Sequence, residues 1–134
     1  MAFPNYMLDT NICIYAMKKQ IPILRKFSQH GPEKLAISSL VAAELAFGVE
    51  KSQRSVENKK SLTLFLDSMN IVAWDESAMW HFAEHRKKLQ QAGTPIGEID
   101  LLLASQALAM DAVLVTNNTR EFERIEGLKL ENWA

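Results

Sequence analysis

Short apolar segments that alternate with longer helical segments are the feature that most constrains how this chain can fold. Five segments have the length and composition of short strands: residues 6–8, 35–38, 71–74, 112–116 and 128–130. Helical periodicity lies between them, at residues 12–17, 39–47, 56–67, 76–91 and 99–110. Strands separated by helices favour a mostly parallel sheet covered by helices. The sequence therefore predicts an α/β fold with about five short strands.

The apolar residues of the helical segments predict which side chains enter the core. Leu62, Phe65 and Leu66 follow the i, i+3, i+4 spacing that places them on one helical face. In the segment 76–91, Trp80 and Ala83 are expected to face the core. These faces would pack on the sheet.

Length and composition limit the class of protein. The chain has 134 residues, 48% of them apolar and 23% charged, which predicts one soluble domain over residues 1–134. The single cysteine, Cys13, favours a reducing, cytoplasmic location. Residues 1–5 do not read as a signal peptide, and no apolar run reaches the roughly 20 residues that span a membrane. A net charge of −1 means that any binding of nucleic acid must use local basic patches.

Acidic or amide side chains follow the predicted strands. Asp9 comes directly after the first strand, and Glu44 lies about one turn into the helix after the second. Asp100 opens the helix over residues 99–110. Asn118 follows the fourth strand, with Glu121 one helical turn later. In a parallel sheet these positions share one end of the domain, so we expect the side chains to converge.

Clustered carboxylates suit a divalent metal ion. Mg²⁺ and Mn²⁺ prefer oxygen ligands, and without a cation such carboxylates would repel one another. Acids at helix starts also stabilise helices, by about 0.3–1 kcal/mol each, so any single position has a structural interpretation as well. Glu44 adds weight to the metal interpretation, because a charge within the apolar residues 40–47 needs a partner. Thr10 or Asn11 is predicted to cap the first helix, and Ser39 the helix that carries Glu44.

Two other classes of protein compete with a metal-dependent enzyme. A phosphatase that uses Asp9 as its nucleophile would need a second acid two residues later, where this chain has Asn11. A non-catalytic binding module of the same fold stays open, although such a module has no reason to hold Glu44 in an apolar helix.

Four segments taken together resemble the PIN-domain ribonucleases, specifically the VapC toxins of bacterial VapBC toxin–antitoxin pairs. The matching segments are residues 7–11, 37–48, 95–100 and 115–122, which span nearly the whole chain in the order and at the spacing of the family. The resemblance implies a PIN-domain-like fold of three layers.

The resemblance also implies a site and an activity. Asp9, Glu44 and Asp100 look like the ligands of an Mg²⁺ or Mn²⁺ ion. The family often has a fourth acid where this chain has Asn118, so either Asn118 or the following Glu121 would complete the catalytic set. The activity implied is endonucleolytic cleavage of RNA by a toxin. The segment 116–122 looks most like the enteric-type branch, which cuts initiator tRNA in the anticodon loop.

Partners are implied in the same way. Toxins of this family are neutralised by a VapB-type antitoxin, whose C-terminal segment wraps the toxin, and operator DNA is bound only through that antitoxin. Homodimers are usual, and residues 41–47 and 62–66 could supply an apolar interface. Arg120, near the acidic cluster, is the candidate contact to an RNA phosphate. The alternative is a non-catalytic PIN-like module that acts through its antitoxin.

Overall fold

A single parallel sheet of five strands organises the molecule. The computed structural model describes residues 5–134. The expectation about a signal peptide concerned residues 1–5, of which all but Asn5 lie outside the described residues. The strands run in the order β3-β2-β1-β4-β5, and every neighbouring pair is parallel. Their bounds are β1 Tyr6–Leu8, β2 Leu35–Ser38, β3 Asn70–Val72, β4 Val113–Val115 and β5 Lys129–Glu131. The prediction of a parallel sheet with five short strands is confirmed.

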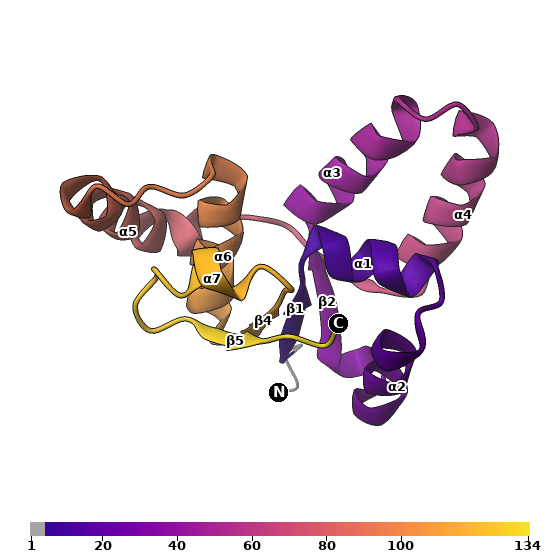
Figure 1. Ribbon diagram of the computed structural model, residues 1–134, viewed down its shortest axis with the longest axis horizontal. Helices are drawn as coiled ribbons and strands as arrows, with labels where there is room; N and C mark the ends of the chain where they lie inside the picture. Colours follow the sequence, from indigo (N-terminus) through magenta and orange to yellow (C-terminus); the bar gives the residue numbers. More distant parts are fainter. Residues whose placement is uncertain (1–4) are drawn as a thin grey trace.

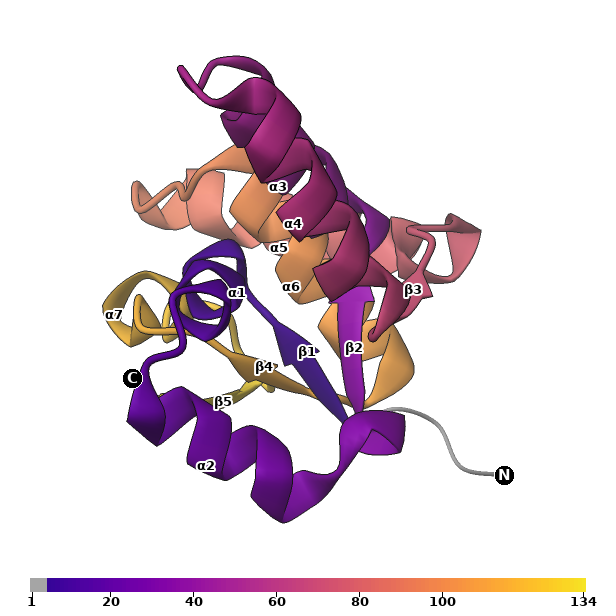
Figure 2. The same ribbon diagram turned by 90° about the vertical axis from the view of Figure 1, so that its right-hand side faces the viewer.

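Helices cover both faces of the sheet, which gives three layers. Their bounds are α1 Thr10–Met17, α2 Ile21–His30, α3 Ser39–Glu50, α4 Ser55–Asp67, α5 Met79–Ala92, α6 Glu98–Met110 and α7 Thr119–Phe122, with 3₁₀ turns at Pro32–Lys34 and Glu76–Ala78. In Figure 1, α1 to α4 lie on one side of the strands and α5 to α7 on the other; Figure 2 shows the sheet from the side of α1 to α4. No helix within residues 5–134 is long and apolar enough to cross a membrane.

The order of the strands reverses its direction between β1 and β4, at the centre of the sheet. From β1 the chain adds β2 and β3 in one direction, and then β4 and β5 in the other. The connection between two parallel strands is right-handed. Helices in connections that run in opposite directions across the sheet therefore lie on opposite faces of the sheet. The helices that follow β1 and β4 therefore diverge, and ligands of such sheets bind where they part.

The central strands are buried on both faces, which explains their continuous apolar runs. Met7 and Leu8 of β1 and Leu114 and Val115 of β4 have no exposed surface. Cys13, on the first helix after β1, is fully buried as well. The sheet is thus a rigid support for the side chains at its carboxyl edge.

The predicted face of α5 is wrong. Trp80 is 68% exposed and Ala83 is exposed, whereas His85 and Leu89 are buried. The segment 76–91 is not one continuous α-helix, because Glu76–Ala78 forms a 3₁₀ turn and α5 begins at Met79. For α4 the prediction is confirmed: Leu62 is buried and its two predicted neighbours on that face are half-buried.

The helix α2 was not predicted from the sequence. The segment Ile21–His30 forms α2, although it contains a proline and only Ile23 is buried. Proline at the second position is tolerated because the first turn of a helix lacks donors to lose. The last turn of α2 is held by aromatic packing, in which the ring of Phe27 meets the ring of Trp133 edge-on. Trp133 is remote in sequence, so only the tertiary structure supplies this contact.

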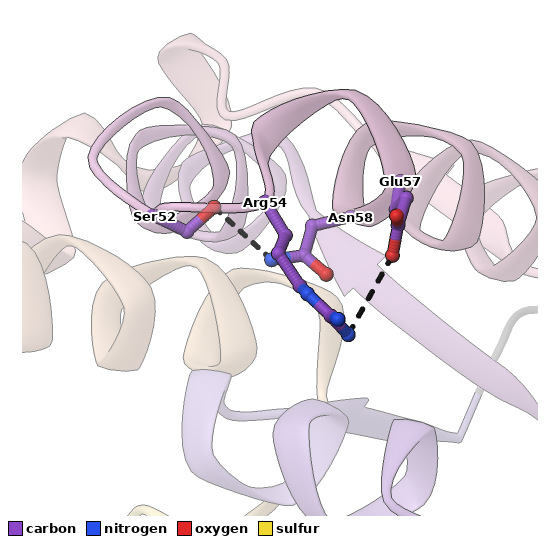
Figure 3. Close-up of polar contacts among 4 residues, drawn as sticks. All are labelled: Ser52, Arg54, Glu57 and Asn58. Carbon is purple, nitrogen blue, oxygen red and sulfur yellow. Dashed lines mark hydrogen bonds and ion pairs between the residues drawn. The ribbon is translucent and has the colours of Figure 1, made fainter.

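The hairpin of α3 and α4 projects from the body of the domain (Figure 1). Gly48 lies inside α3, which continues to Glu50. Two contacts close the corner between the helices, as Figure 3 shows: the amide of Asn58 donates to Ser52 Oγ at 3.0 Å, and Arg54 pairs with Glu57 at 3.7 Å. The hairpin and α1 together line a groove that leads to Glu44.

Candidate metal and catalytic site

Asp9 sits at the carboxyl end of β1 and forms the N-cap of α1. Its Oδ1 accepts a hydrogen bond of 2.8 Å from the backbone N–H of Thr10. Its Oδ2 accepts one of 2.7 Å from the hydroxyl of Thr116, at the end of the neighbouring strand β4. The predicted cap was Thr10 or Asn11, which is wrong because the acid itself occupies the capping position. One oxygen of Asp9 is therefore held by the start of α1 and the other by the residue that follows β4.

Burial raises the pKa of Asp9 above its ordinary value, since the side chain is only 7% exposed. The hydrogen bonds from Thr116 and Thr10 act in the opposite direction, because they stabilise the ionised form. The negative charges of Glu44 and Glu121 raise the pKa further. The ionisation of Asp9 is thus disfavoured by Glu44 and Glu121, two carboxylates that lie far from it in the sequence.

Glu44 reaches the site from α3. The hydroxyl of Thr10 donates to Glu44 Oε1 at 2.7 Å, and the side chain is half-buried. Its neighbours Ala43 and Ala46 are exposed, so the apolar segment does not surround Glu44 in an interior as expected. The partner of this charge in the structure is the hydroxyl of Thr10.

The cap of α3 differs from the prediction. Ser38, not Ser39, is the N-cap, and its Oγ accepts from the N–H of Leu40 at 3.1 Å. Ser39 Oγ accepts instead from the backbone N–H of Trp74 at 3.1 Å. Both serines thus fix the start of the helix that carries Glu44, one through the helix and one through the chain after β3.

Asp100 and Glu121 come together from α6 and α7. Glu121 Oε1 accepts from the backbone N–H of Gly97 at 3.1 Å, and its Oε2 accepts from the amide of Asn118 at 2.6 Å. Asp100 is close enough to Glu121 that the negative charge of Glu121 raises the pKa of Asp100. Asn118 therefore orients Glu121 through its amide nitrogen.

The pKa of Asp100 is raised to about 7. Desolvation is the largest cause, followed by the negative charges of Glu121, Asp9 and Glu44. Carboxylates that share a site disfavour one another's ionisation in this way. The four acids predicted from separate segments thus form one electrostatic cluster at the carboxyl edge of the sheet.

The cluster has no cationic partner within residues 5–134. None of the four ion pairs in that range includes a site carboxylate. Arg120, the candidate phosphate contact, is exposed and forms none of those pairs. In the same range, no three acidic, histidine or cysteine side chains lie close enough together to hold a metal ion.

The donor set nevertheless fits a hard divalent cation. All the converging side chains offer carboxylate oxygens, which Mg²⁺ and Mn²⁺ prefer. A β-carbon added at Gly97 would lie 3.5 Å from Asp100 Oδ2 and 3.9 Å from Glu121 Oε1. The glycine thus leaves space beside both carboxylates.

Sequence reasoning missed the role of Thr116. Its hydroxyl links Asp9 to the turn after β4, because it also accepts the N–H of Asn118 at 3.0 Å. Leu8 pairs with Val115 in the sheet, so the residues that follow them are neighbours. The signal in the sequence was a hydroxyl-bearing residue, Thr116, directly after a buried strand. Its role becomes clear only from the pairing of β4 with β1, which places it beside Asp9.

Comparison with known proteins establishes the family. The family model of the PIN domain matches residues 6–128. The chain is 44% identical to ribonuclease VapC2 of Rickettsia felis, over 96% of this chain and 97% of that protein. It is 37% identical to the tRNA(fMet)-specific endonuclease VapC of Shigella flexneri, over 97% of this chain and 98% of that protein.

The fold agrees with a solved structure of the same family. It superimposes on a chain of the DNA-bound VapBC complex of Salmonella typhimurium with a TM-score of 0.92 and 37% identity, over 97% of this chain and 98% of that chain. The chain therefore belongs to the PIN-domain family and, within it, to the VapC ribonucleases. The resemblance that the sequence motifs indicated is confirmed.

Proposed function

We propose that this ribonuclease is the toxin of a type II toxin–antitoxin pair and cleaves RNA endonucleolytically with Mg²⁺ or Mn²⁺. The observation that carries the proposal is the cluster of four carboxylates, which come from the end of β1, α3, α6 and α7. Such a concentration of negative charge, without a basic partner within residues 5–134, suits a bound cation and the phosphate that it attracts.

Asp9, Glu44 and Asp100 would hold the metal, with Glu121 as the fourth carboxylate in place of the acid that the family often has at Asn118. When bound, the cation supplies positive charge at the scissile phosphate and makes a water molecule more acidic. Both oxygens of Asp9 already accept hydrogen bonds from the protein. Oδ2 of Asp100 borders the open space at Gly97, so Asp100 is the carboxylate that takes the proton from the attacking water.

The substrate that fits best is a transfer RNA. The relative from Shigella flexneri is a tRNA(fMet)-specific endonuclease, and the similarity covers nearly the whole of both chains. We therefore propose initiator tRNA, cut in the anticodon loop, as the RNA of this enzyme. Its place of action is then the cytoplasm, where this RNA works.

A VapB-type antitoxin is the proposed partner. Two of the solved relatives are VapBC complexes bound to DNA, and in the complex from Rickettsia felis the DNA is a fragment of the promoter. In this chain the groove between α1 and the α3–α4 hairpin is lined largely by apolar side chains: Ile14, Met17, Leu45, Val49 and Leu62. An amphipathic segment of the antitoxin would fill that groove and reach Glu44, and operator DNA would be bound through the antitoxin. We also expect a homodimer.

The metal dependence is tested with purified protein and initiator tRNA. Cleavage is expected with Mg²⁺ or Mn²⁺ and absent in excess chelator. Asp9→Asn and Asp100→Asn each remove one negative charge from the site while keeping the shape of the side chain, so each is expected to lower the cleavage rate at least 100-fold. Undiminished cleavage by either variant, or cleavage in chelator, would contradict the proposed site.

A matched control separates loss of the site from loss of the fold. Asp111→Asn makes the same chemical change at an exposed residue, where Asp111 pairs with Lys129 on the surface. This variant is expected to cleave at the wild-type rate, and all three are expected to keep the wild-type circular dichroism. A non-catalytic module would show no cleavage even for the wild type.

A further inference from the structure

A row of three uncharged polar side chains lies beside the acidic cluster and takes no part in holding it. The amide of Asn117 donates to the hydroxyl of Tyr15 at 2.8 Å. The amide of Asn11 donates to Asn117 Oδ1 at 3.5 Å. The side-chain hydrogen bond of Asn11 thus goes to Asn117 and not to Asp9. We call these three residues the amide–tyrosine row.

The position of the row follows from the two central strands. In the turn after β4, Thr116 binds Asp9 and Asn118 binds Glu121, while Asn117 between them reaches Tyr15 on α1. Asn11 and Tyr15 are one helical turn apart on α1, two and six residues after Asp9. The row therefore borders the carboxylates on the side of α1.

The row has free hydrogen-bonding capacity. Asn11 and Asn117 are exposed, and Tyr15 is half-buried. Because the oxygen of Tyr15 accepts from Asn117, its own proton is left to donate. Within residues 5–134, no hydrogen bond occupies Oδ1 of Asn11. The row thus offers at least one donor and one acceptor to a ligand at the site.

We propose that the amide–tyrosine row binds the edge of one unpaired nucleobase next to the scissile phosphate. This inference rests on the proposed function. The row carries no charge, so it does not suit a phosphate, whose usual partners are Lys and Arg. Side-chain amides present a donor and an acceptor side by side, as the edges of bases do. Proteins that read RNA by sequence contact unpaired bases in loops through such groups.

The test uses stem-loop RNAs with seven randomised loop nucleotides, cleaved in the presence of Mg²⁺, with the products sequenced. The wild type is expected to favour one base at one position near the cut by at least tenfold. Asn117→Ala and Tyr15→Phe are expected to lower that preference about tenfold at that position alone. On the best loop, both variants should raise KM more than they lower kcat.

A second amide provides the control. Asn132→Ala removes an exposed amide near the C-terminus, where its oxygen accepts only from the N–H of Ala134, and it should leave the base preference unchanged. If the row has a purely structural role, the variants will cleave all loops more slowly by the same factor, and this result would overturn the proposal. An unchanged base preference in both variants would overturn it as well. If the wild type cleaves none of these loops and does not cleave initiator tRNA, the proposed function fails instead.

Discussion

At the residue scale, hydroxyl and amide groups hold the carboxylates in place. Thr116 fixes Asp9, Thr10 fixes Glu44, and Asn118 fixes Glu121. Each donor compensates part of the cost of bringing like charges together. The arrangement is thus set by neutral partners rather than by ion pairs, which leaves the negative charge of the cluster available for a cation.

Thr116 should be essential for both stability and rate. Thr116→Val keeps the volume but removes the hydroxyl, which leaves Oδ2 of Asp9 and the N–H of Asn118 without this partner. An unsatisfied buried group costs about 1–3 kcal/mol, so urea denaturation should show a loss of that size. The cleavage rate should fall at least tenfold. Thr116→Ser keeps the hydroxyl and should cleave within a fewfold of the wild type; equal behaviour of the two variants would contradict this role.

At the scale of the elements, the loop before α6 is shaped to leave space. Gly97 is the N-cap of α6 with a φ of −57°, which any residue can adopt. Its N–H holds Glu121, and the absence of a side chain keeps the space beside Asp100 open. The glycine is therefore explained by the site and not by the backbone.

Two glycine substitutions separate these explanations. Gly97→Ala should leave the free energy of unfolding within about 1 kcal/mol of the wild type, because the backbone is compatible with alanine. Its methyl group should lower the cleavage rate at least tenfold by filling the space beside Asp100 and Glu121. Gly48→Ala adds a methyl group with nothing within 4 Å in α3, and should stabilise the protein by about 0.5–1 kcal/mol without slowing cleavage. Rapid cleavage by the Gly97 variant would show that the space is not used.

At the scale of the whole molecule, the site lowers the stability of the metal-free fold. The pKa values of Asp9 and Asp100 are raised in the folded state, so folding favours their protonated forms. Their contribution to stability is fully present below the unfolded pKa of about 4 and is lost as the pH rises through the folded pKa, which is about 7 for Asp100. A bound cation should reverse that loss.

Thermal unfolding should reveal this coupling. Without metal, the contribution of Asp100 should make the protein more stable at pH 5.5 than at pH 8, by on the order of 1 kcal/mol after screening by solvent. At pH 8, Mg²⁺ at 100 times its dissociation constant should add about 2.7 kcal/mol. Asp100→Asn should raise the stability of the metal-free protein at pH 8 and weaken its response to Mg²⁺. A midpoint that does not respond to Mg²⁺ in the wild type would argue against a metal at this site.

The sequence by itself determined the class of fold, the parallel sheet and the acids at its carboxyl edge. These follow from local patterns, since apolar runs, helical periodicity and the residue after each strand are all readable along the chain. The phase of α5 and the existence of α2 were not readable in this way. They depend on which partners the helices meet, as the exposure of Trp80 and the contact of Phe27 with Trp133 illustrate.

Only the tertiary structure decided how the acids are held and which residue accompanies them. The proposal of Glu121 rather than Asn118 rests on the hydrogen bonds that Glu121 accepts from Gly97 and Asn118, and on the effect of its charge on the pKa of Asp100. Asp9 and Thr116 are 107 residues apart, and the pairing of β1 with β4 brings them together. The physical reason is that a hydrogen bond forms only when donor and acceptor are placed to within a few tenths of an ångström. The order of residues along the chain does not specify positions that closely.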